Sequence, residues 1–95
     1  MTEHFVVVAY DISDDRRRTR LYKALLPFGT PVQFSVFECL VTEKELETLK
    51  QKVGKLIKPT LDHVRYYDLC AACRQRIETT AAGTPPARHE DTLIV

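Results

Sequence analysis

Hydrophobic residues near the start of the chain form a run that is apolar at both odd and even positions. Residues 5–10 read Phe-Val-Val-Val-Ala-Tyr and end at Asp11. A strand with one solvated face alternates apolar and polar residues, so an unbroken run favours a strand that is buried on both faces. The pattern therefore predicts a central strand over residues 5–10.

A helix is predicted directly after this strand. Ser13 is a preferred N-cap residue, and Asp14 and Asp15 would then lie in the first turn, where the helix dipole favours acidic side chains. Pro27 and Gly29 are expected to close the helix, with Gly29 in the C′ position. Four apolar or aromatic residues recur at helical spacing: Leu21, Tyr22, Leu25 and Phe28.

The next apolar segment, residues 32–41, alternates as a strand does. Val32, Phe34 and Val36 are separated by polar residues, and Phe37 then breaks the phase. A change of phase inside a strand indicates an extra residue, so we expect a bend or bulge just before Glu38.

A second helix and further strands complete the pattern. Residues 42–45, Thr-Glu-Lys-Glu, form a capping box, and Pro59 is expected to end the helix. Additional strands are predicted over residues 64–69, 77–79 and 93–95. The apolar stripe of this helix consists of Leu46, Leu49, Val53, Leu56 and Ile57.

The order of elements predicts an α+β fold, a ferredoxin-like βαββαβ sandwich with an extra C-terminal strand. In this plan both helices cover one face of the sheet, so the apolar second face of the first strand needs another cover. A second copy of the chain would supply it, which predicts a homodimer. We divide the chain into a domain over residues 1–80 and a flexible C-terminal arm over residues 81–95. The arm would end in a strand that pairs with a sheet edge of its own subunit or crosses to the partner.

Composition narrows the class of protein. The chain has 95 residues, enough for one domain, and 44% of them are hydrophobic, which excludes the disordered class. No apolar run approaches the roughly 20 residues of a membrane span, and the N-terminus lacks the pattern of a signal peptide. We therefore expect a cytoplasmic protein without membrane contact, whose cysteines are reduced. The net charge of +1 means that any nucleic-acid contact must come from a local basic cluster.

Asp11 is the first candidate for chemistry, because it ends the predicted central strand. Magnesium is often held by only one or two carboxylates and keeps several water molecules, and a metal-held water can attack a phosphate. One carboxylate per chain is few for such a site, but a two-fold dimer would bring a second copy of Asp11. The alternative is that Asp11 forms an Asx-turn before the helix.

Basic residues follow Asp11 on the predicted helix. With 100° per residue, Arg17 and Arg18 flank the buried stripe near the end of the first strand, while Arg16, Arg20 and Lys23 turn outward. Guanidinium groups bind phosphate through paired donors, so this helix is a candidate phosphate-binding element. A solvated basic face is the alternative.

Cys70 and Cys73 form a CxxC motif whose role stays open at this point. One such pair is half of a zinc site at best, and Cys39, His63 and His89 have no spacing typical of a partner pair. A thioredoxin-type motif would open a helix after a strand, which this position partly permits. A structural or incidental role is the third reading.

Three segments together resemble a known family: Val-Ala-Tyr-Asp-Ile-Ser-Asp-Asp at residues 8–15, Arg-Arg-Arg-Thr-Arg-Leu at residues 16–21, and Val-Gln-Phe-Ser-Val-Phe-Glu at residues 32–38. In order and spacing, residues 4–80 resemble the small CRISPR-associated adaptation nucleases, the second universal subunit of the spacer-acquisition machinery. Asp68, Leu69, Cys70 and Cys73 also resemble that family, in which such a cysteine pair is common but dispensable.

The resemblance implies a prokaryotic, cytoplasmic, metal-dependent endonuclease that acts on RNA or double-stranded DNA during spacer acquisition. It implies a homodimer in which two copies of Asp11 share Mg²⁺ or Mn²⁺, with Arg18 and Arg20 on the nucleic acid. Arg17 remains a phosphate-binding candidate from its position on the helix. Tyr10, Ser35 and Phe37 would support the site.

The resemblance also implies an alternative in which catalysis is vestigial. The dimer would then be a DNA-binding scaffold that bridges dimers of the larger CRISPR integrase subunit. A toxin-type ribonuclease on the same fold is a third hypothesis.

Overall fold

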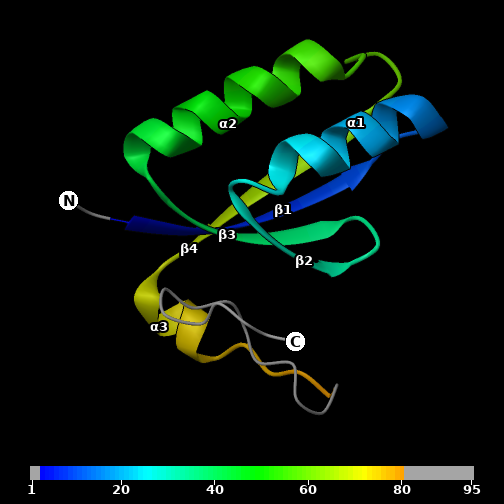
Figure 1. Cartoon of the computed structure of the whole chain (residues 1–95). Helices are drawn as coiled ribbons and strands as arrows, with labels where there is room; N and C mark the ends of the chain where they lie inside the picture. Colours follow the sequence, from blue (N-terminus) through cyan, green and yellow to red (C-terminus); the bar gives the residue numbers. More distant parts are fainter. Residues whose placement is uncertain (1–2, 81–95) are drawn as a thin grey trace.

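Seven helices and strands follow one another in the computed structural model, which describes residues 3–80 (Figure 1). Their order is β1 (Glu3–Asp11), α1 (Asp15–Leu25), β2 (Gly29–Gln33), β3 (Val36–Thr42), α2 (Glu43–Leu56), β4 (His63–Leu69) and α3 (Ala71–Gln75). The predicted arm over residues 81–95 and its strand at 93–95 lie outside the described residues.

The four strands form one antiparallel sheet in the order β2-β3-β1-β4. The long helices α1 and α2 lie on one face of the sheet, and α3 lies on the other side (Figure 1). This arrangement confirms the predicted α+β fold with β1 at the centre. No helix among residues 3–80 has the length and apolar character of a membrane span.

Residues 32–41 are not a single strand, and this prediction was wrong. The chain reverses at Phe34 and Ser35, between β2 and β3, and the register shifts between Pro31 and Gln33 rather than before Glu38. The reversal contains no Gly, Pro or Asn, so the alternating β-forming pattern continues through it and does not indicate a turn. Its stabilising contacts come from β1 instead, because the Tyr10 backbone N–H donates to the Ser35 carbonyl at 3.0 Å.

Both ends of α1 differ from the prediction. The N-cap is Asp14, whose Oδ2 accepts from the Arg17 backbone N–H at 2.9 Å, so Ser13 lies outside the helix. Gly29 is not a C′ residue but the first residue of β2, opposite Cys39. A Cβ at Gly29 would lie 2.4 Å from the Glu38 carbonyl oxygen, so close strand approach requires glycine here.

The strand predicted over residues 77–79 is also wrong, because these residues have no regular structure. The preceding segment forms the short helix α3, whose N-cap is Cys70. Three β-forming residues are too few to define a strand by pattern. The sheet still has four strands, because residues 29–42 form two strands, β2 and β3.

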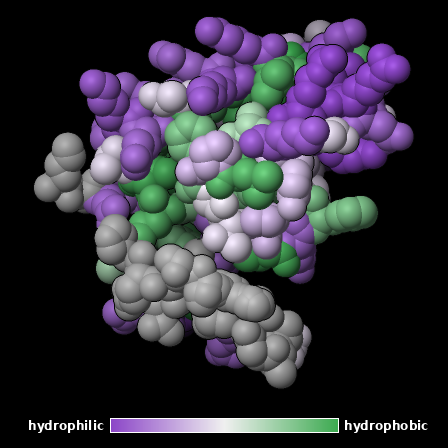
Figure 2. All heavy atoms as spheres, in the orientation of Figure 1, coloured by the Kyte–Doolittle hydropathy of each residue, from purple (hydrophilic) through white to green (hydrophobic). Residues whose placement is uncertain are grey.

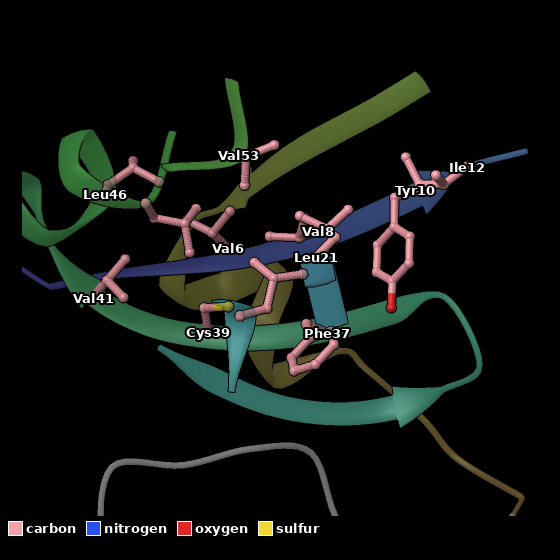
Figure 3. Packing of buried hydrophobic residues seen from close by; sticks show 12 residues of the cluster. Val6, Val8, Tyr10, Ile12, Leu21, Phe37, Cys39, Val41, Leu46 and Val53 are labelled. Atoms are coloured by element: carbon pink, nitrogen blue, oxygen red, sulfur yellow. The ribbon is translucent and has the colours of Figure 1, made fainter. Parts of the chain in front are cut away.

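The main core lies between the sheet and the two long helices (Figure 3). Val6, Val8 and Tyr10 of β1 enter it, as do the predicted residues Leu46, Leu49 and Val53 of α2. The predicted capping box is present, since Thr42 and Glu45 exchange bonds of 2.8 Å and 3.2 Å. On the sheet face opposite α1 and α2, Phe5 is buried but Val7 and Ala9 are only half-buried. Burial of β1 on both faces is therefore confirmed only in part.

Candidate functional site

Asp11 is the last residue of β1 and its side chain is exposed. Val6, Val8 and Tyr10 face α1 and α2, so alternation along the strand directs Asp11 to the opposite face of the sheet. Within residues 3–80 its carboxylate makes no hydrogen bond or ion pair, and helix capping falls to Asp14. The Asx-turn alternative is therefore absent from the described part of the chain, and the carboxylate has its lone pairs available.

Arg18 lies at the same end of β1. Its Nη1 donates to the Ile12 carbonyl at 3.0 Å, and its Nη2 pairs with the Asp15 carboxylate. Because Ile12 directly follows Asp11, the first bond holds the guanidinium beside the strand end. The Arg18 side chain remains 44% exposed, so it can meet a ligand from solvent.

Arg17 points elsewhere. Its Nε and Nη2 donate to the two oxygens of Asp62 at 2.8 Å and 3.0 Å, and the Asp62 side chain is fully buried. Asp62 also accepts from the Lys58 backbone N–H at 2.8 Å. The Arg17 guanidinium, helped by backbone donors, lowers the pKa of Asp62 to about 2. This pair ties the loop before β4 to α1, and phosphate binding by Arg17 would have to compete with it.

Arg16, Arg20 and Lys23 are exposed on the outer side of α1, as predicted. Hydrophilic side chains cover the outer surfaces of α1 and α2 (Figure 2). Arg18 and Arg20 therefore differ in their surroundings: the Arg18 guanidinium is anchored beside the strand end, whereas Arg20 is exposed to solvent.

A cavity of about 550 Å³ lies between α1 and the β2–β3 hairpin. Sequence reasoning missed Tyr22 and Gln33 as part of this region, because only the hairpin reversal brings β2 back beside α1. The lining residues are Tyr10, Arg18, Thr19, Tyr22, Pro31, Val32, Gln33 and Phe34.

The predicted supporting residues meet around the end of β1. The Tyr10 hydroxyl donates to the Phe34 carbonyl at 3.4 Å, and burial raises the pKa of that hydroxyl. Phe37 is fully buried, 6.4 Å from the Tyr10 ring and 5.4 Å from the Tyr22 ring between centroids. Ser35 binds β1 through its carbonyl. These contacts fix the hairpin relative to the strand end that carries Asp11.

The Asp11 carboxylate at the end of β1 is a ligand that suits a weakly bound hard cation. Among residues 3–80 no group of three or more His, Cys, Asp or Glu side chains could hold a metal ion. One exposed carboxylate fits magnesium, which keeps most of its water ligands. A firmer site would need a ligand from a second molecule.

Comparison with known proteins gives a consistent result. The sequence profile described as "CRISPR associated protein Cas2" matches residues 4–77. The CRISPR-associated endoribonuclease Cas2 1 of Chloroflexus aurantiacus is 41% identical over 92 residues, which cover 96% of this chain and 99% of that protein. The CRISPR-associated endonuclease Cas2 2 of Thermus thermophilus is 36% identical over 94 residues, with 99% and 100% covered. A chain in the structure of a partial Cas6-RT-Cas1–Cas2 complex matches with a TM-score of 0.70 at 25% identity, covering 81% of this chain and 90% of that chain.

Proposed function

Because this chain belongs to the CRISPR-associated Cas2 family, we propose that it is a metal-dependent endonuclease that hydrolyses RNA or double-stranded DNA during spacer acquisition. The observation that supports this proposal best is that the Asp11 carboxylate is exposed and unpaired within the described residues. Among residues 3–80 its carboxylate has no partner, although it ends the central strand and directly precedes Ile12, whose carbonyl holds Arg18. A structural carboxylate is normally paired, as Asp62 is.

Asp11 would hold Mg²⁺ or Mn²⁺, and a bound cation supplies an activated water and offsets charge on phosphate. Arg18 orients the phosphate, because the Ile12 carbonyl fixes its guanidinium while the side chain stays 44% exposed, and the phosphate would share it with the exposed Asp15 carboxylate. Arg20 extends the basic surface along α1, where it binds the backbone of the nucleic acid. Arg17 contributes mainly by fixing α1 through Asp62.

A homodimer would complete the site. The sheet face opposite α1 and α2, which carries Asp11, also exposes apolar surface at Val7 and Ala9, and Tyr67 opposite Val7 is 45% exposed. Burial of this face against a second copy would remove apolar area from water and bring two copies of Asp11 together. The strand predicted at residues 93–95 would pair with a sheet edge in that dimer.

The CRISPR integrase subunit is the expected protein partner. The expected location is the cytoplasm of a prokaryote. The match to a chain in a complex that contains Cas1 supports this partner. The exposed basic residues of α1 would then share DNA binding with the integrase, which fits a net charge of only +1.

Cleavage of labelled RNA and duplex DNA tests the enzyme. We expect Asp11→Asn to lower the rate at least about 100-fold, since loss of the metal ligand removes several kcal/mol of transition-state stabilisation. Glu47→Gln, an equal charge change on the exposed face of α2, is the control and should cleave like the wild type, and chelation should stop both. Equal rates for Asp11→Asn and wild type would refute the proposed site.

The scaffold is the second candidate, because one chain offers only one carboxylate at this position. It requires spacer acquisition to survive Asp11→Asn and to fail when Arg18 and Arg20 are both changed to Gln. Loss of acquisition in Asp11→Asn at normal protein levels would contradict the scaffold and favour the enzyme.

A further inference from the structure

Cys70 and Cys73 lie together at the junction of β4 and α3, away from Asp11. Cys70 is the N-cap of α3, and its Sγ accepts from the Cys73 backbone N–H at 3.4 Å. Both cysteines are exposed free thiols, whereas Cys39 is buried. We propose that Cys70 and Cys73 form a dithiol modification site, which a low-molecular-weight disulfide oxidises to an intramolecular disulfide bond.

The local geometry suits this bond. On a helical turn the Cβ atoms of residues three apart lie about 5–6 Å from each other, and a disulfide brings them to about 3.5–4.5 Å. The Arg74 N–H already donates to the Cys70 carbonyl at 2.9 Å, so the turn between the two cysteines is closed. The five-residue helix α3 has no buried residue that would resist a further closing of this turn.

The two thiols are not equivalent. The Cys73 N–H donates to Cys70, which lowers the pKa of Cys70, while the neighbouring Cys70 sulfur raises the pKa of Cys73. Burial raises the pKa of Cys39 to about 11. Since the thiolate is the nucleophile in disulfide exchange, Cys70 is the attacking residue, Cys73 the resolving residue, and Cys39 is inert.

Oxidised glutathione illustrates the reaction. The Cys70 thiolate attacks one of its sulfurs, forms a mixed disulfide and releases one glutathione thiolate, which takes up a proton. The Cys73 thiol then loses its proton to solvent and attacks Cys70 Sγ, which displaces a second glutathione. In sum, two cysteine thiols lose two electrons and two protons, and one glutathione disulfide becomes two glutathione thiols.

The bond would act on the sheet face opposite α1 and α2. Arg74 of α3 lies over the Phe5 ring, 4.7 Å from its centroid, and Phe5 is a buried residue of that face. In the reduced protein α3 depends on a weak N–H···S cap and a few backbone bonds. The disulfide fixes this turn covalently and thereby stabilises the cover that Arg74 gives Phe5.

Mass spectrometry of the native, full-length protein after treatment with oxidised glutathione tests the chemistry. We expect the wild type to lose two thiols to an internal disulfide without retaining glutathione. Cys73→Ser should rapidly accumulate a glutathione adduct on Cys70, and Cys70→Ser should react more slowly at Cys73. Persistent adducts on the wild type, or equal rates for the two variants, would overturn the proposal.

Hydrogen exchange tests the structural consequence. Amides of residues 71–76 should exchange at least about tenfold more slowly in the oxidised wild type, because the disulfide opposes local opening. The oxidant-treated Cys70→Ser variant is the control and should show no slowing. Unchanged exchange in the oxidised wild type would overturn the stabilisation of α3. Neither readout depends on nuclease activity.

Discussion

Gly29→Ala should destabilise the fold strongly, although the change adds one methyl group. The new Cβ would lie 2.4 Å from the Glu38 carbonyl oxygen, 2.5 Å from Cys39 Sγ and 2.9 Å from Cys39 Cα. Two of these atoms belong to the backbone of β3, so no rotamer change relieves the contact. Overpacking of this kind costs typically about 1–3 kcal/mol, and the backbone contacts place Gly29→Ala in the upper half of that range.

Gly54→Ala is a matched control in the same chain. Gly54 lies in α2, and a Cβ there has no heavy atom within 4 Å. Both substitutions reduce the freedom of the unfolded chain equally, so that contribution cancels between them. Alanine is a better helix former, and Gly54→Ala should stabilise the protein by about 0.5–1 kcal/mol.

Urea unfolding followed by circular dichroism measures both effects. The two variants should differ by at least about 2 kcal/mol in the free energy of unfolding, with similar m-values. In a domain of this size each kcal/mol moves the melting temperature by about 4–8 °C, so the variants should shift in opposite directions. If Gly29→Ala is as stable as Gly54→Ala, the close pairing of β2 and β3 at this position is refuted.

Three further substitutions test separate contacts. His4 bonds Asp68 and Glu43 at 2.8 Å each, and these contacts, chiefly the one with Asp68, raise its pKa above 6.5. The stabilisation by protonated His4 is complete below pH 6.5 and is lost as the pH rises through the higher folded pKa. Urea unfolding between pH 6 and 9 should therefore show a smaller loss of stability for His4→Gln than for wild type. Asp62 has a folded pKa of about 2, below its usual 3.8, so its contribution is present above pH 3.8 and is lost as the pH falls toward 2. Asp62→Asn should therefore flatten the acid limb of unfolding curves recorded from pH 6 to 2, and an unchanged limb would contradict the role of Arg17. Thr42→Ala removes the capping box and should lower the urea-derived free energy of unfolding by about 1 kcal/mol, whereas no loss would mean that water replaces the cap.

The features that local sequence determined are those whose interactions lie within a few residues. The capping box joins Thr42 to Glu45 three residues away, and the stripe of α2 follows from helical periodicity. The unbroken apolar run of β1 indicated its central position, which the strand order confirms. Asp11 could be singled out for the same reason, because it directly ends that run.

Features that depend on contacts between residues far apart in the chain could not be predicted from local sequence. Gly29 appeared to be a helix terminator, but its close neighbour is the backbone of β3. Arg17 appeared equivalent to Arg18, until folding brought it to Asp62, 45 positions along the chain. The hairpin turn at Phe34 and Ser35 contains no Gly, Pro or Asn, and Tyr10 of β1 donates hydrogen bonds to it.

The sequence by itself thus determined the central strand, the two long helices and the strand before α3, and it determined which carboxylate ends the central strand. Only the tertiary structure decided which arginine stays partly exposed at the strand end and which is held by a buried acid. Periodicity and capping act within one or two turns, whereas the partner of a side chain is chosen by strand pairing and burial, which join residues far apart in the chain.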